Sequence, residues 1–347
     1  MKTRAIRSLS GAVLVLCSLI VGLANSAVAQ LCLDKDKKPK PCYELWVPLG
    51  AYDQNSANTK EHSGLVTWNY KKPGDEIQDT AFANMFKPLV QGGVPFLWVF
   101  SQCFGGGMFD ELNVLGGVQS GISASSYRQR AIYQLPLPLG NGVNFSTAYI
   151  QAIRNNITTA EPMASKAADN DPWGPSPGPT PPRDLEIQNS EQPVYFTIGA
   201  GADALKLSDY KDNGVAILWS GEPDEVLDGA ETSRLILELI RLKYKPTNIW
   251  VLYGSGKYSK GTDFVGIAVN NNLPATQLRA ATRKQLQAVA NKIVMNNNNF
   301  VFFFANDHGW NNARGGAVPR AGWEGQIPYN YYPPGTDDIG SGDEDLE

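Results

Sequence analysis

Two long apolar runs constrain the fold of this chain more than any other feature. Residues 94–100 read Val-Pro-Phe-Leu-Trp-Val-Phe, and residues 300–305 read Phe-Val-Phe-Phe-Phe-Ala. A run without the polar alternation of a half-exposed strand is typical of a strand that is buried on both faces. Such strands belong to α/β proteins, in which helices cover both faces of the sheet. We therefore expect an α/β fold with a mostly parallel sheet flanked by helices.

Other segments alternate between strand and helix patterns. Phe82, Met85, Phe86 and Leu89 fall at i, i+3, i+4 and i+7, which predicts a helix over 79–91 with one apolar face. Further strands are expected at 64–69, 118–124, 215–219 and 248–253, and further helices at 147–155, 231–244 and 276–294, the first started by Ser146 and the last capped by Thr276. In such a sheet the strand ends carry the chemistry.

The first residues have the pattern of a secretory signal. Lys2, Arg4 and Arg7 precede an apolar stretch, and Ala27-Val-Ala29 is a small-residue cleavage site. We expect residues 1–29 to be removed and the mature protein to be secreted or periplasmic. No later stretch is long enough to span a bilayer, so we expect no membrane association.

Export also changes how the cysteines are interpreted, because they tend to pair in an oxidising compartment. Cys32 and Cys42 lie close together in a polar segment suited to a disulfide. Cys103 is then the one cysteine of the mature chain without an expected disulfide partner. An odd cysteine in an exported protein indicates intermolecular pairing or a reactive thiol. A buried, inert cysteine is the common alternative.

Composition divides the chain into six parts. After the signal, 30–60 is expected to be an N-terminal extension that holds the Cys32–Cys42 disulfide. A Pro/Gly-rich linker is expected at 166–190, because that stretch suits neither a helix nor a central strand. It joins 61–165 and 191–315, two halves of one domain, and 316–347 is a tail with an acidic, disordered end.

Charge and residue types narrow the function. The formal net charge of −4 argues against a nucleic-acid partner. Two histidines and one leftover thiol are too few for a zinc site, so we expect no metal. Gly254-Ser-Gly256 lacks the other residues of a phosphate-binding loop, and we expect no cofactor.

Cys103 and His308 follow the two apolar runs in matching positions, and each is followed closely by glycine. Because parallel neighbours end at the same edge of a sheet, we expect thiol and imidazole side by side, within reach of a Cys–His dyad. A nucleophilic thiol reacts as the thiolate and needs an exposed, positively polarised setting. Gly105-Gly-Gly107 would let a substrate backbone come close.

These segments resemble the legumain and caspase-like cysteine peptidases, legumain more than caspases. Ser101-Gln-Cys-Phe-Gly-Gly-Gly-Met-Phe109 is similar to the family's Glu-Ala-Cys-Glu-Ser-Gly-Ser-Met-Phe, and 300–309 is similar to its apolar strand ending in Asp-His-Gly. Residues 212–221, Ala230-Glu231 and 248–253 resemble its first strand, helix and second strand.

The order of these segments differs from the family's order of first strand, second strand, His strand and Cys strand. Here the Cys half comes first. A circular permutation accounts for this, with the former termini joined by the linker and new termini opened after the histidine. Residues 64–68 and 75–85 resemble the segment that normally follows the catalytic histidine.

The resemblance implies an exported cysteine endopeptidase that acts on a peptide or protein substrate. Cys103 is then the nucleophile, His308 shuttles protons, and the backbone N–H groups of Gly309 and Cys103 hold the oxyanion. His62 is the alternative base, disfavoured because no apolar run precedes it. Transfer to water makes the protein a hydrolase, and transfer to an amine makes it a ligase.

The resemblance also implies a pocket for the residue before the scissile bond. Its expected members are Ser101, Ser123, Ser125, Glu222 and Asp228. Ser101 and Leu227 depart from the family's Glu and basic residue, which leaves asparagine specificity open. The loop that contains Glu222, Asp224, Glu225 and Asp228 either binds a basic side chain of the substrate or is an ordinary solvated loop. Asp307 either orients His308 or forms a turn.

Two other functions stay open. Gly105-Gly-Gly107 stands where the family has more polar residues, which favours a caspase-like domain that has lost catalysis and serves as a binding or assembly module. A redox role for Cys103 is weaker, because no second cysteine lies near it in the sequence.

Overall fold

The protein is known from a computed structural model that describes residues 32–33, 36–46, 63–68, 76–126, 131, 144–171, 192–221, 227–256, 274, 277–295, 299–306 and 309–311. The expected signal, most of the expected linker and the expected tail lie outside the described residues. Among the described helices, none has both the length and the apolar character needed to cross a membrane.

The described part is built on an eight-stranded sheet with the spatial order β11-β10-β9-β12-β6-β7-β8-β3. The six strands from β11 to β7 run parallel, β8 is antiparallel to β7, and β3 is parallel to β8. Their bounds are β3 Glu44–Leu45, β6 Phe96–Ser101, β7 Gln119–Ser123, β8 Val194–Ile198, β9 Gly214–Ser220, β10 Ile249–Tyr253, β11 Leu278–Arg279 and β12 Phe300–Asn306. The prediction of a mostly parallel α/β sheet is confirmed.

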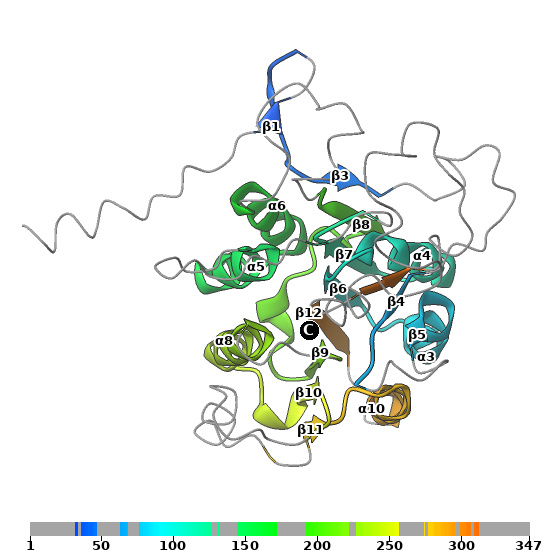
Figure 1. Ribbon diagram of the computed structural model, residues 1–347. Coiled ribbons are helices and arrows are strands. Elements are labelled where there is room, and N and C mark those ends of the chain that lie inside the picture. The colour runs from blue at the N-terminus through cyan, green and yellow to red at the C-terminus, as the bar shows by residue number, and fades with distance from the viewer. Residues whose placement is uncertain are drawn as a thin grey trace, which may run out of the picture.

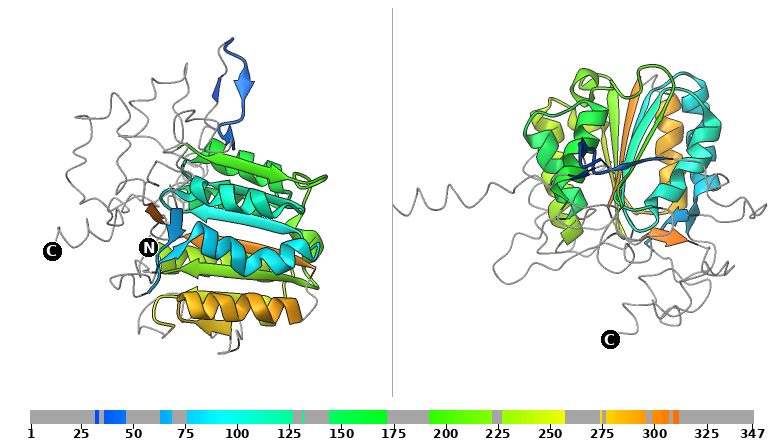
Figure 2. Two further views of the ribbon diagram at one scale, coloured as in Figure 1. Left: turned by 90° about the vertical axis from the view of Figure 1, so that its right-hand side faces the viewer. Right: turned by 90° about the horizontal axis from the view of Figure 1, so that it is seen from above.

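Helices cover both faces of the sheet in three layers (Figures 1 and 2). One face carries α5 (Phe145–Arg154), α6 (Ala160–Asn170) and α8 (Leu227–Arg241). The other carries α3 (Asp79–Gln91), α4 (Phe109–Leu115) and α10 (Arg283–Met295). Short 3-10 helices are η1 (Gly105–Met108), η2 (Leu207–Tyr210) and η3 (Pro246–Asn248).

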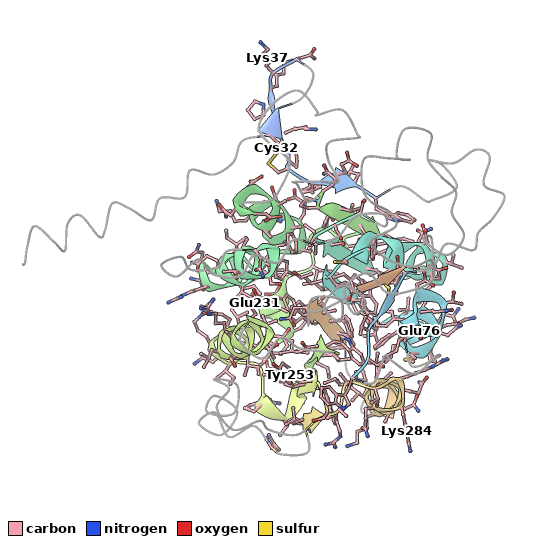
Figure 3. The ribbon with its side chains drawn as sticks, viewed as in Figure 1. Cys32, Lys37, Glu76, Glu231, Tyr253 and Lys284 are labelled. Atoms are coloured by element: carbon pink, nitrogen blue, oxygen red, sulfur yellow. A yellow bond between two sulfur atoms is a disulfide. The ribbon has the colours of Figure 1, made fainter. Side chains whose placement is uncertain are left out.

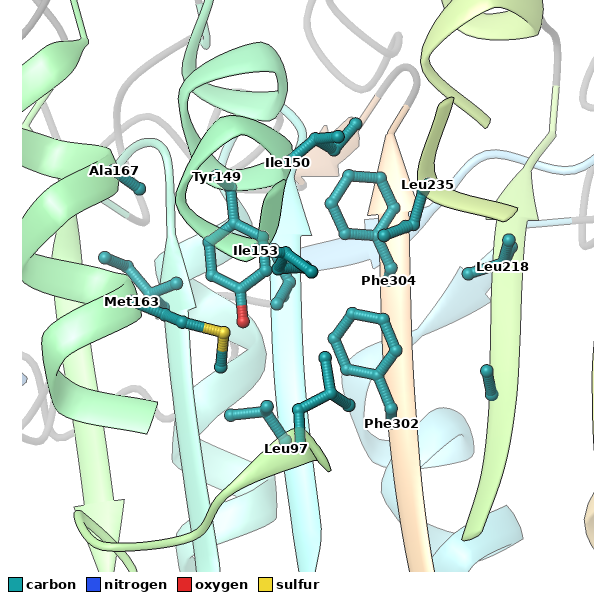
Figure 4. Packing of buried hydrophobic residues seen from close by; sticks show 14 of the residues in the cluster. Leu97, Tyr149, Ile150, Ile153, Met163, Ala167, Leu218, Leu235, Phe302 and Phe304 are labelled. Atoms are coloured by element: carbon teal, nitrogen blue, oxygen red, sulfur yellow. The ribbon is translucent and has the colours of Figure 1, made fainter. Parts of the chain in front are cut away.

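The two apolar runs of the sequence become the central strands β6 and β12. Successive side chains of a strand point to opposite faces, so each run contributes side chains to the hydrophobic core on both faces of the sheet. Phe302 and Phe304 pack with Leu97 under α5 and α8 (Figure 4), while Phe303 packs with Trp98 on the opposite face. Burial on both sides explains why no polar residue interrupts either run.

A smaller sheet lies beside the carboxyl ends of the central strands. It has the order β13-β4-β5, with β4 at Ser63–Leu65, β5 at Ile77–Gln78 and β13 at Gly309–Asn311. β4 is antiparallel to β13, with Gly309 opposite Leu65. The sheet therefore places an early segment of the chain directly beside the residues that follow β12.

The N-terminal hairpin projects from the body of the protein (Figure 3). Its strands β1 (Cys32–Leu33) and β2 (Pro39–Lys40) are antiparallel, and the expected disulfide between Cys32 and Cys42 is present. The disulfide is consistent with an extracellular location.

Several predicted boundaries are wrong. The helix expected from Ser146 begins at Phe145, because the Asn144 side chain caps it, and the helix expected at 231–244 spans Leu227–Arg241. The helix expected from Thr276 begins at Arg283, because residues 278–279 first pair with β10 as an edge strand, and the Thr282 hydroxyl oxygen accepts the Gln285 N–H at 3.3 Å. Residues 166–170, expected in the linker, belong to α6. The apolar face of α6 consists mostly of alanine and methionine, Met163 and Ala167 among them, a weak signal in the sequence.

Candidate functional site

The ends of β6 and β12 lie side by side, and this pairing defines the candidate site. The two strands are parallel neighbours, with Asn306 opposite Ser101. Cys103 comes two residues after Ser101, and His308 comes two residues after Asn306. His308 and Asp307 themselves lie outside the described residues, as does His62.

Gly309, the residue after His308, lies against the backbone of Cys103. A Cβ atom added to Gly309 would clash with the carbonyl oxygen of Cys103 and would be 2.8 Å from its carbonyl carbon and 3.1 Å from its amide nitrogen. Only glycine permits so close an approach without displacement of the neighbouring chain. Asn306 and Gly309, which flank Asp307 and His308 in the sequence, are thus both held at the end of the Cys103 strand.

The thiol of Cys103 is buried, which differs from the exposed setting expected of a nucleophile. Sγ accepts the N–H of Ala131 at 3.2 Å, and the S–H group is 3.7 Å from the Ala131 carbonyl oxygen. The main chain of Ala131 therefore covers the thiol in this conformation.

The chain turns sharply immediately after Cys103. Phe104 has φ = 58°, in the left-handed region that bulky residues rarely adopt. This turn leads into η1 and α4. Backbone in this region is strained and persists only when its surroundings fix it, as the full burial of η1 does here.

The glycine-rich turn η1 packs tightly against the neighbouring strands. A Cβ on Gly105 would be 2.5 Å from Ser123 Oγ and 2.8 Å from Phe100 Cβ, and the Gly106 N–H donates to the Ser125 carbonyl at 3.0 Å. Gly105 therefore allows the loop after Cys103 to pack onto the end of β7.

Of the five residues expected to line a pocket, three are described fully. Ser123 Oγ donates to the Ser125 carbonyl at 2.6 Å, and Ser125 Oγ donates to the Gln102 carbonyl at 3.0 Å. Both serines are buried and brace the loop that carries Cys103. Asp228 falls in the first turn of α8, but its side chain, like the whole of Glu222, lies outside the described residues.

Ser101, the third, belongs to a buried polar network that the sequence did not predict. Its hydroxyl hydrogen-bonds to that of Ser146 on α5. Thr147 Oγ1 donates to Glu231 Oε1 at 3.1 Å, and Asn306 Nδ2 is 3.4 Å from Glu231 Oε2. We name these residues, together with Asn144 and Thr232, the Glu231 network. This network connects the ends of β6 and β12 with the N-terminal parts of α5 and α8.

Glu231 stands at the centre of the network, between α5 and α8 (Figure 3). Only 4% of its surface is exposed. Burial raises the pKa of the Glu231 carboxyl, while hydrogen bonds with Asn144, Ser146, Asn306 and Thr147 oppose the rise. One sequence signal could have revealed this residue: it lies four positions before Leu235 on the apolar stripe of its helix, where a carboxylate is out of place.

Two acidic residues, the buried Asp79 and the partly buried Glu111, lie close together on the opposite face. Asp79 accepts the Ser63 N–H at 2.8 Å and the Thr80 N–H at 2.6 Å, which ties β4 to the start of α3. Burial and the neighbouring carboxylates of Asp79 and Asp110 raise the pKa of Glu111 to about 8. The raised pKa favours the protonated form of Glu111 in the folded protein.

Among the described residues, no group of three or more His, Cys, Asp and Glu side chains is arranged to bind a metal ion. Comparison with known proteins gives no match: neither a family model, nor a curated protein, nor a solved structure is similar to this chain.

Proposed function

We propose that this protein is an exported cysteine endopeptidase in which Cys103 and His308 form the catalytic dyad. One observation carries the proposal. β6 and β12 are parallel neighbours, and Gly309 lies against Cys103, so the residues on both sides of His308 are held at the end of the Cys103 strand. A dyad needs thiol and imidazole within hydrogen-bond reach, and this arrangement favours it.

The proposed reaction is acyl transfer. His308 accepts the proton of the Cys103 thiol, and Sγ forms a bond to the carbonyl carbon of the scissile peptide. The C–N bond then breaks as His308 passes the proton to the leaving amine. Water attacks the thioester, which releases the carboxylic acid and restores the thiol.

The developing oxyanion needs donors that are fixed before the reaction begins. The backbone N–H groups of Cys103 and Gly309 come from two segments in direct contact. In this proposal they hold the oxyanion, and one such donor is typically worth ~10²–10³ in rate.

The fold is further proposed to be a circularly permuted caspase-like domain. The segments that resemble the family's second strand, first strand, His strand and Cys strand are β10, β9, β12 and β6, which lie consecutively in one parallel sheet. β4, from the segment that resembles the one after the family's histidine, pairs with β13 directly after His308. Both pairings support a rearranged chain order on one domain.

Substrate must reach the thiol past the main chain of Ala131. A reacting carbonyl has to approach to about 3–3.5 Å, and the Ala131 amide nitrogen now occupies that distance at 3.2 Å. Catalysis therefore requires Ala131 to move from Sγ.

The test is hydrolysis of fluorogenic peptides that vary the residue before the scissile bond. Wild-type protein is expected to cleave a subset, with inhibition by iodoacetamide and by peptide aldehydes. Cys103→Ala and His308→Ala are expected to lose this activity, whereas His62→Ala is expected to keep it. Activity retained in Cys103→Ala would refute the proposal.

The burial of Cys103 favours a second candidate, a caspase-like binding or assembly module without catalysis. Such a module would cleave no peptide, and its native thiol would resist iodoacetamide until the protein is unfolded. The peptidase instead predicts alkylation of Cys103 in the native state and protection by a bound peptide aldehyde.

A further inference from the structure

We propose that Glu231 is a positioning residue, whose carboxyl group fixes the ends of the Cys103 and His308 strands relative to each other. The inference rests on the proposed function, because it names the group that sets the geometry of the proposed dyad. It goes beyond the pocket expected from the sequence, which included Glu222 and Asp228 but not Glu231.

The connection on the His308 side runs through Asn306. This side chain is fully buried at the end of β12, two residues before His308. Its Nδ2 is 3.4 Å from Glu231 Oε2, and its Oδ1 is 3.5 Å from Thr232 Oγ1. Two adjacent residues of α8 therefore hold both ends of the Asn306 amide.

The connection on the Cys103 side runs through the start of α5. Asn144 caps this helix by accepting the Thr147 N–H at 2.9 Å, and Thr147 Oγ1 donates to Glu231 Oε1 at 3.1 Å. Ser146, in the same turn, hydrogen-bonds to both Glu231 and Ser101, two residues before Cys103. Each end of the dyad is thus linked to the same carboxyl group.

The burial of Glu231 favours a positioning role over contact with a substrate. Both carboxyl oxygens already have partners within the protein. Burying a carboxyl group is costly unless hydrogen bonds compensate, and removing it leaves several buried donors unsatisfied. The side chain therefore acts through Asn306 and Ser146 and does not reach a bound peptide.

The decisive variant is Glu231→Gln, which keeps the shape but turns an acceptor toward Asn306 Nδ2 into a donor or forces the amide to rotate. Glu238→Gln is the matched control, because Glu238 lies on the same helix and pairs with the exposed Arg241, away from the network. We expect Glu231→Gln to lower kcat on the order of tenfold with KM within about twofold of wild type, since a misplacement of 1 Å costs about 10²-fold. Glu231→Ala should lose more, so the isosteric variant partly rescues it.

A second readout does not depend on peptide hydrolysis. The sequence contains two histidines, so the imidazole resonances of His308 and His62 are assignable by NMR with a His62→Gln variant. Glu231→Gln should shift the resonances of His308 and leave those of His62 in place, and Glu238→Gln should shift neither. Thermal midpoints of all variants separate positioning from unfolding.

The outcomes distinguish the two proposals. If the wild type is active and Glu231→Gln leaves both kcat and the His308 resonances unchanged, the positioning role is overturned and the peptidase proposal stands. A loss of kcat that only follows a loss of thermal stability, with His308 unmoved, would also overturn it. If the wild type cleaves no peptide, the peptidase proposal fails, and the His308 resonances alone decide whether Glu231 positions that residue.

Discussion

Replacement of Gly309 by alanine is the sharpest steric perturbation that the candidate site offers. The new Cβ would clash with the carbonyl oxygen of Cys103 and would be 2.8 Å from its carbonyl carbon and 3.1 Å from its amide nitrogen. Because non-bonded carbon atoms pack at about 3.5 Å or more, the contact with the carbonyl carbon alone requires a separation of roughly 0.7 Å, and the contact with the oxygen requires more. All three are backbone atoms, which cannot rotate out of the way as a side chain can.

Two consequences follow, and they are measured separately. Overpacking of this kind costs about 1–3 kcal/mol in the free energy of unfolding, which urea denaturation measures. In the proposed dyad, a displacement of about 1 Å between Cys103 and His308 should lower kcat/KM by about 10²-fold. Peptide hydrolysis measures the second effect.

Gly201→Ala is the matched control. Gly201 has φ = 80° with open space around its Cα, so alanine there costs about 1–2 kcal/mol through backbone strain without a clash. Gly201 comes shortly after β8. Ile198, the last residue of β8, pairs with Gln119 at the beginning of β7, so Gly201 follows the end of the sheet that lies opposite Cys103. Gly309→Ala with the kcat/KM of Gly201→Ala would refute the reasoning that Gly309 sets the spacing of the dyad.

Three further predictions concern stability. The pKa of Glu111 is raised to about 8 in the folded state, which therefore keeps a proton that the unfolded state loses above the ordinary pKa of 4.5. The free energy of unfolding should fall as the pH rises between these two pKa values and level off above the higher one. Glu111→Gln should flatten this dependence in urea titrations at several pH values. Replacing Cys32 and Cys42 by alanine opens a loop of sequence separation 10, and should destabilise the hairpin by about 2–3 kcal/mol, seen as faster amide exchange there than in the central sheet. Tyr149→Phe removes a buried hydroxyl without a hydrogen-bond partner among the described residues, and should raise the free energy of unfolding by about 1 kcal/mol; a lower value would indicate an unseen partner.

The sheet was predictable from the sequence because its central strands are buried on both faces. The continuous apolar runs at 94–100 and 300–305 predicted β6 and β12 as buried strands. The apolar spacing of Phe82, Met85 and Leu89 predicted α3 with the observed bounds. Short edge strands such as β3 and β11 have two residues each, too few to show a pattern.

The pairing of the Cys103 and His308 strands was predictable for a related reason, since parallel strands end at one edge. The Glu231 network was not predictable in this way. Glu231, Asn306 and Ser146 come from distant parts of the chain, and each one alone is an ordinary polar residue. Their hydrogen bonds depend on how α5 and α8 pack on the sheet, which local sequence patterns do not specify. The burial of the thiol under Ala131 depends likewise on a contact between distant segments.

The most direct test of the central claim is covalent labelling of the native protein with a peptidyl chloromethyl ketone, followed by mapping of the adduct by mass spectrometry. The account predicts one adduct, on Cys103, formed at similar rates in wild type and His62→Ala and at least about 10²-fold more slowly in His308→Ala. Labelling of His308→Ala at the wild-type rate, or a native wild-type Cys103 that takes no label, would contradict it.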